Sequence, residues 1–155
     1  MRTTHNLKFS DKLKEPHRTI YEVGTANGLR VSDVISLKKN CLKVGKPTIR
    51  EQKTGKAKRL YLPVKTRKKL EQLAKQSPND FIFFSKSSKS GHISRQAVFK
   101  AFKKAAKESG IEVNIATHTM RKNYAYKYFG KCKNLQKLQK KLNHSNASET
   151  ALYLI

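Results

Sequence analysis

Lys141-Leu142-Asn143-His144-Ser145, with Tyr153 nine residues after its histidine, is the most informative part of this sequence. Its asparagine tolerates the left-handed backbone conformation in which helices commonly end, so we expect a helix to stop there. The segment Thr117-His118-Thr119-Met120-Arg121 precedes it. His118 and Arg121 are three residues apart, so that on a helix they share one face and can converge on one anionic group. We therefore expect these segments to bring their polar side chains to one surface.

The charge of the chain limits its partners. The 155 residues include 35 Lys+Arg and 10 Asp+Glu, which gives a net charge of +25. Because such an excess repels itself unless a polyanion relieves it, we expect nucleic acid or an anionic membrane as the partner. Only eight of the basic residues are arginines, and a lysine-dominated surface predicts largely sequence-independent binding to a phosphate backbone.

The cysteines and the hydropathy indicate the compartment. Cys41 and Cys132 are far apart and lack the C-x-x-C spacing, so we expect neither a disulfide framework nor a zinc site, as in a reducing cytosol. There is no run of 18 apolar residues and no signal-peptide pattern at the N-terminus. These features predict a soluble cytoplasmic protein with no membrane partner.

The spacing of apolar residues predicts an α+β fold that is mainly helical. Helices are expected at 10–23, 31–37, 66–75, 94–109, 117–130, 134–142 and 148–154. Three segments alternate or are rich in β-branched residues, with Gly and Pro turns between them: 41–44, 48–52 and 59–62. They predict a small three-stranded antiparallel sheet that ends at Pro63, and residues 81–84 predict a further short strand or extended segment.

A His-x-x-Arg, a Leu-x-His and a later tyrosine in this order resemble the active-site pattern of tyrosine recombinases, the phage integrase family. Two earlier segments, Gly28-Leu29-Arg30-Val31-Ser32-Asp33 and Lys53-Thr54-Gly55-Lys56, stand in the order in which that family has its first arginine and its hairpin lysine. The resemblance runs roughly from Ile20 to Tyr153. The family usually has glycine where this chain has Asn143 and leucine where it has Met120, and both replacements are compatible with the same backbone.

The resemblance implies a reaction on DNA. In this family a tyrosine hydroxyl attacks the scissile phosphodiester, forms a 3′-phosphotyrosine and frees a 5′-hydroxyl, without ATP. The roles it implies are Tyr153 as nucleophile, Arg30 and Arg121 as clamps of the phosphate oxygens, His118 as an acid–base group near the tyrosine, and His144 as a donor to the phosphate. Arginine suits the clamp because its charge is permanent and its donors form a fork. The acidic residues are scattered singly, a poor supply of metal ligands, so we expect no metal and no cofactor.

The resemblance also assigns a lysine and an acid. The family's hairpin lysine protonates the leaving 5′-oxygen, and Lys53, just before Thr54, occupies its place; Lys56 in the same hairpin is the alternative. Asp33, three residues after Arg30, matches an acidic position that orients an active-site group, and we do not expect it to bind a metal.

The extent of the resemblance leads to an expectation about domains and function. We expect residues 1–155 to be a single catalytic domain without the N-terminal core-binding domain and the C-terminal tail that most members have. The expected activity is site-specific recombination or integration of double-stranded DNA by a phage or bacterial protein that self-associates on DNA in its full-length context. The alternatives are type IB topoisomerase-like nicking and closing, a non-catalytic DNA-binding module, or a basic RNA-binding protein. The last lacks the sequence signature of an RNA-recognition motif.

Overall fold

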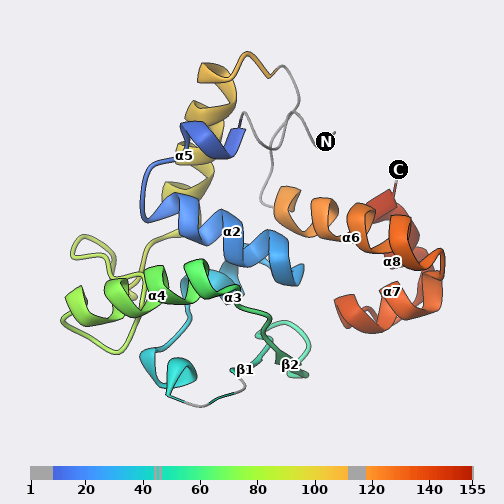
Figure 1. The fold of residues 1–155 in the computed structure, drawn as a ribbon, viewed down its shortest axis with the longest axis horizontal. Coiled ribbons are helices and arrows are strands. Elements are labelled where there is room, and N and C mark those ends of the chain that lie inside the picture. The colour runs from blue at the N-terminus through green and yellow to red at the C-terminus, as the bar shows by residue number, and fades with distance from the viewer. Residues whose placement is uncertain (1–8, 44, 46, 112–117, 155) are drawn as a thin grey trace.

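The fold consists mainly of helices, with one short antiparallel hairpin (Figure 1). The computed structural model of the chain describes residues 9–43, 45, 47–111 and 118–154. In chain order the elements are α2 (His17–Asn27), α3 (Val31–Ile35), the 3-10 helix η1 (Lys39–Leu42), β1 (Thr48–Arg50), β2 (Ala57–Arg59), α4 (Val64–Gln76), α5 (Arg95–Glu108), α6 (Thr119–Cys132), α7 (Leu135–Leu142), α8 (Ala147–Ala151) and the 3-10 helix η2 (Leu152–Leu154). The prediction of a mainly helical α+β architecture is confirmed.

The first expected helix, 10–23, is wrong in its bounds. Residues 9–12 are helical, but Pro16 interrupts the chain and α2 begins one residue later. A proline inside a helix removes a backbone hydrogen bond and clashes with the preceding turn, so one continuous helix cannot form here. The expected stop at Gly24 is also wrong, since α2 continues to Asn27.

Gly24 is a packing glycine rather than a helix end. A Cβ at this position would lie 2.3 Å from the Sδ atom of Met120, so the missing side chain lets α6 approach α2 closely. The helix ends instead at Gly28, whose φ of 65° is in the left-handed region that favours glycine. This turn places Arg30 at the start of α3.

Within the described residues the sheet has two strands, not three. β1 and β2 pair antiparallel, with Thr48 opposite Arg59. The expected strand at 41–44 is wrong, because Cys41 and Leu42 belong to η1, and Val44 lies outside the described residues.

The backbone before η1 is already paired with another segment. Lys38 forms an isolated bridge with Phe81, and the Lys39 N–H donates to the carbonyl of Asp80 at 2.8 Å. Residues 38–39 thus pair with residues 80–81, and the chain then winds into η1, so Cys41 and Leu42 are not extended beside the hairpin. The pairing also confirms the expected extended segment that begins at Phe81.

The N-terminal caps follow their residue types. Ser94 accepts a hydrogen bond from the Ala97 N–H at 3.1 Å and caps α5, as expected. Asn134 caps α7 in the same way by accepting from the Lys137 N–H at 3.0 Å. Side chains that satisfy these backbone donors therefore fix where the two helices begin.

The last helices differ from the expectation at their ends. α6 does not stop at Gly130 but continues to Cys132, and Lys133 then takes a left-handed φ of 51°. The expected cap residue Thr117 lies outside the described residues. The expected final helix, 148–154, is α8 followed by the tighter turn of η2.

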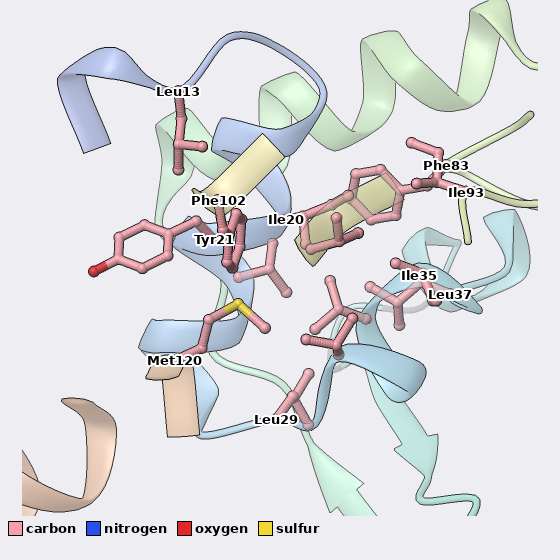
Figure 2. Packing of buried hydrophobic residues seen from close by; sticks show 14 of the residues in the cluster. Leu13, Ile20, Tyr21, Leu29, Ile35, Leu37, Phe83, Ile93, Phe102 and Met120 are labelled. Carbon is pink, nitrogen blue, oxygen red and sulfur yellow. The ribbon is translucent and has the colours of Figure 1, made fainter. Parts of the chain in front are cut away.

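Helix α6 joins two hydrophobic clusters. The larger cluster lies among α2, α3 and α5 and includes Met120 (Figure 2). The smaller cluster consists of Ala125, Leu138 and Leu142, with Tyr124, Tyr128, Phe129, Tyr153 and Leu154 packed against it. Because Met120 and Ala125 both belong to α6, Arg121 lies where the two clusters meet.

Gly28→Ala is expected to lower the free energy of unfolding by about 2–4 kcal/mol. The left-handed φ accounts for about 1 kcal/mol, and a Cβ would lie 2.5 Å from Cδ1 of the Tyr124 ring. Gly110→Ala is the matched control, because its φ is 67° and, among the described residues, a Cβ there meets nothing within 4 Å. Urea unfolding of the two variants measures the difference, and equal losses would contradict the role of the ring contact.

Candidate active site

Arg121 is the centre of the site. Its side chain, in the first turn of α6, is fully buried. Its Nη1 donates to the carbonyl of Gly28 at 2.7 Å, and its Nη2 donates to the carbonyl of Leu142. No described residue accepts a hydrogen bond from its Nε. One guanidinium thus ties α6 to the turn after α2 and to the end of α7, and leaves its Nε–H without a partner among the described residues.

Arg30 lies beside Arg121 and is also largely buried. It stands at the N-terminal end of α3, and its Nη1 donates to Oε2 of the buried Glu51 at 2.9 Å. Burial, and then the positive charge of Arg30, lower the pKa of Arg121. The two arginines that the sequence analysis singled out are therefore brought together, although 91 residues separate them.

His118 and Tyr153 meet from opposite ends of the C-terminal region. Nδ1 of His118, at the N-terminal end of α6, is 3.3 Å from the hydroxyl of Tyr153 in η2. Local desolvation, and then the charges of Arg121 and Arg30, lower the pKa of His118. The imidazole is therefore neutral at pH 7 and can accept a proton.

The Tyr153 ring is half-buried against the other site residues. Its centroid is 5.0 Å from that of His144, and the Arg121 Cζ atom lies 5.8 Å from the same centroid. The smaller hydrophobic cluster supports the ring from α6 and α7. The phenol is thus held in the midst of the three residues His118, Arg121 and His144.

His144 is buried just after α7. Asn143 ends that helix with a left-handed φ of 55°, as its residue type predicts. The His144 Nδ1 is 2.9 Å from the hydroxyl oxygen of Thr150, and no described residue hydrogen-bonds its Nε2. Burial, and then the charge of Arg121, lower the pKa of His144 to about 4. This ring is also neutral at pH 7.

The hairpin lysines differ in their surroundings. Lys53 lies in the turn between β1 and β2, exposed, with its Nζ 4.0 Å from Oε1 of Glu149. Together with Arg30 and His118 it lines a cleft of about 410 Å³. Lys56 is exposed and is not among the residues that line this cleft. Of the two hairpin lysines, Lys53 is thus the one that shares this cleft with Arg30 and His118.

Two further residues hold the site in place: Lys58, which no motif of the sequence indicated, and Asp33, which was expected to orient an active-site group. Lys58 on β2 donates from Nζ to the carbonyl of Lys141 at 2.7 Å, and burial lowers the pKa of Lys58 to about 8. Asp33 accepts from the Gln52 N–H at 3.0 Å, next to Lys53, and burial raises the pKa of Asp33. Lys58 carries no motif. Only the alternation of β2 could have indicated that its side chain turns inward.

This arrangement of arginines, histidines and a tyrosine on a mainly helical frame has the fold of tyrosine recombinase catalytic domains. The chain is similar to a lambda integrase dimer bound to a COC′ core site (TM-score 0.77, 18% identity, covering 100% of this chain and 58% of that one). It is also similar to XerA recombinase (TM-score 0.82, 17% identity, 100% and 58%). The chain belongs to the phage integrase family, whose model matches residues 2–154.

The curated proteins to which the chain is similar include recombinases of the same kind. The probable integrase/recombinase YoeC of Bacillus subtilis is 28% identical over 137 residues, which cover 87% of this chain and 75% of the relative. Tyrosine recombinase XerD of Listeria monocytogenes is 31% identical over 146 residues, 88% of this chain and 48% of the relative. The chain therefore spans about half the length of the XerD relatives it matches. The resemblance stated from the sequence is confirmed.

His144 is expected to make the protein less stable in acid. An unfolded histidine titrates near ~6.5 and the folded ring near about 4, so the folded state resists protonation. The stability that the neutral ring contributes is therefore fully present above the unfolded pKa and is lost as the pH drops from about 6.5 towards 4, by about 3 kcal/mol in total. Urea unfolding at several pH values should show a smaller acid loss in His144→Gln. A variant with the wild-type pH dependence would contradict the assignment.

Proposed function

We propose that this chain is the catalytic domain of an enzyme that cuts and rejoins DNA strands at specific sites through a covalent 3′-phosphotyrosine at Tyr153. The observation that carries the proposal is the position of the Tyr153 hydroxyl, 3.3 Å from Nδ1 of the neutral His118. Its ring lies beside Arg121 and His144, each of which has a buried nitrogen with no hydrogen-bond partner among the described residues.

The unused donors fit a phosphate. A buried polar atom without a partner costs free energy, so such atoms commonly await a ligand. Arg121 Nε and His144 Nε2 are two of these, and Arg30 adds a second guanidinium beside them. In the tautomer in which Nδ1 accepts a hydrogen bond from the Thr150 hydroxyl, His144 carries its proton on Nε2 and donates a hydrogen bond to a phosphate oxygen. Fixed donors of this kind stabilise the charge of the pentacoordinate transition state without reorganising.

The proton transfers follow from the same geometry. His118 accepts the proton of the Tyr153 hydroxyl as the phenol oxygen forms a bond to phosphorus. The bond from phosphorus to the 5′-oxygen breaks, and Lys53 gives that oxygen a proton, with Lys56 as the alternative donor. The phosphotyrosine keeps the energy of the phosphodiester, so the reverse attack by a 5′-hydroxyl closes the strand.

The partner is double-stranded DNA. Solved relatives include lambda integrase bound to a core site as a dimer and to a Holliday junction as a tetramer. By analogy with them, we expect self-association on DNA in a full-length context, with residues 1–155 as one catalytic domain acting in the cytoplasm of a bacterium. Among the described residues, no helix is both long and apolar enough to cross a membrane.

Binding to duplex DNA is expected to depend steeply on salt. With a net charge of +25 the protein displaces counterions from several phosphates at once. Affinity should fall by about three orders of magnitude between about 50 mM and about 200 mM salt, with little preference for sequence. Fluorescence anisotropy with two unrelated duplexes of equal length measures this. An affinity that does not change with salt would contradict the electrostatic argument.

A suicide substrate tests the proposed reaction. In a duplex nicked close to the cleavage site, the short 5′-hydroxyl fragment diffuses away after attack and the phosphotyrosine accumulates. A protein–DNA adduct that resists SDS and forms in the presence of EDTA is the expected result. A DNA-binding module without chemistry gives binding and no adduct. A topoisomerase-like enzyme would in addition relax a supercoiled plasmid that lacks any recombination site.

A further inference from the structure

We propose that Glu51 is a positioning residue that, with Asn143, sets the placement of Arg30 relative to the turn that carries His144. This inference rests on the proposed function, because the two groups it places are those assigned to the phosphate. Glu51 carried no role in the sequence analysis, and no substrate atom needs to touch it. Its contribution lies in three contacts made by one buried carboxylate.

The first contacts are those of the side chain. Glu51 is 1% exposed, and its Oε2 accepts a hydrogen bond from Nη1 of Arg30 at 2.9 Å. Its other oxygen, Oε1, accepts from Nδ2 of Asn143 at 3.1 Å. The hydroxyl of Thr54, in the hairpin turn, lies 3.4 Å from Oε2. Because a buried carboxylate is costly without partners, these contacts fix its position and those of its donors.

The backbone of Glu51 closes the hairpin that bears Lys53. Its N–H donates to the carbonyl of Lys56 at 2.9 Å, and its carbonyl accepts from the Gly55 N–H at 2.8 Å. A single residue therefore joins the lysine hairpin, the first arginine and the end of α7. These three regions carry Lys53, which is assigned to the leaving 5′-oxygen, and Arg30 and His144, which are assigned to the phosphate.

Asn143 makes its part of the link through a side chain that a glycine would lack. The neighbouring residues of the turn are held through their backbone instead, with Lys58 donating to the carbonyl of Lys141 and Arg121 donating to that of Leu142. Among the described residues of this turn, Asn143 is the one whose side chain reaches the carboxylate that holds Arg30. The side chain of Asn143 thus couples the two halves of the site directly.

The negative charge of Glu51 should weaken DNA binding, although the contacts of the same carboxylate favour the reaction. A carboxylate beside Arg30 and Arg121 offsets part of the positive potential that a phosphate meets. Glu51 therefore weakens binding of DNA slightly while it orients the arginine for the reaction. A purely structural residue would not separate the two quantities, since its loss would weaken both.

Three variants and one control test the proposal. Glu51→Gln removes the charge and keeps the shape, whereas Asn143→Gly removes the amide and suits the left-handed φ. Glu71→Gln is the control, because Glu71 pairs with Arg67 on exposed α4 and makes the same change in net charge. The third variant combines Glu51→Gln with Asn143→Gly. Each is measured for the single-turnover rate of adduct formation on the suicide duplex and for DNA affinity.

The expected results separate rate from affinity. Glu51→Gln should form the adduct about 10–100-fold more slowly, the usual cost of losing an orienting partner, while binding DNA more tightly than Glu71→Gln does. Asn143→Gly should bind as the wild type does and react several-fold more slowly. The combined variant should lose less than the product of the two single losses, because both act through one contact.

Two outcomes overturn the proposal: a Glu51→Gln rate equal to that of the control, or a parallel loss of rate, affinity and thermal stability. If the wild type forms no adduct, the proposed function fails. The affinity comparison then still tests Glu51, because a variant that binds DNA no more tightly than Glu71→Gln refutes its place beside the phosphate-binding arginines.

Discussion

Tyr153→Phe is expected to abolish the SDS-resistant adduct and to leave duplex DNA binding nearly unchanged. The variant keeps the aromatic ring that packs against His144 and Arg121, so the geometry of the site is retained. It removes only the hydroxyl next to His118, and without that oxygen no bond to phosphorus can form. One hydroxyl adds little to an interface built on charge, which is why binding persists.

The other tyrosines supply matched controls for this result. Tyr126→Phe changes an exposed residue of α6, the helix that carries Arg121. Tyr124→Phe and Tyr128→Phe change two stacked rings on the face of α6 opposite Tyr126. Each of the three should form the adduct at close to the wild-type rate. An adduct that survives Tyr153→Phe, or that disappears in one of the controls, would reassign the nucleophile.

Arg121→Lys is expected to lower adduct formation by at least about 10²-fold and to destabilise the fold. The lysine keeps the positive charge, but its three N–H donors leave a single nitrogen and cannot span the carbonyls of Gly28 and Leu142 as the planar guanidinium fork does. The loss of partners for two carbonyls in a fully buried position should cost about 2–4 kcal/mol of unfolding free energy. Urea unfolding and the suicide-substrate assay measure the two effects separately.

Arg67→Lys is the control for the fork geometry. Arg67 on α4 also uses two donors, one to Glu71 and one to the carbonyl of Leu42, but it lies outside the site. This variant should keep the adduct and lose little stability, because its side chain is partly exposed. An Arg121→Lys protein that reacts as fast as Arg67→Lys would show that charge alone suffices at position 121.

The candidate residues of the site could be chosen from sequence because their order along the chain resembles the active-site pattern of the phage integrase family. His118 and Arg121 share a helical turn, and Asn143 ends α7 as its conformational preference indicates. The contacts that these residues make with distant parts of the chain could not be predicted in the same way. Arg121 was expected to clamp a phosphate, yet two of its donors serve the fold, and this follows only from its burial.

The errors have a common physical cause. The segment 41–44 that was expected to form a third strand has a suitable composition, but residues 38–39 just before it are paired with residues 80–81, and Cys41 and Leu42 belong to the 3-10 helix η1. Glycine is common at helix ends, but Gly24 lies inside α2, where the absence of a side chain leaves room for Met120. Glu51 has no sequence pattern at all. In each case the deciding partner is distant in the chain.

The tight winding of η2 sets the direction in which the Tyr153 side chain leaves the backbone. A 3-10 turn advances about 120° per residue about its axis, whereas an α-helix advances about 100°. Tyr153 is the second residue of η2, so it lies about 40° further round the axis than it would if α8 had continued unchanged. The winding of the backbone therefore sets the direction of the Tyr153 Cα–Cβ bond, and the side-chain rotamer then brings the hydroxyl to within 3.3 Å of His118 Nδ1.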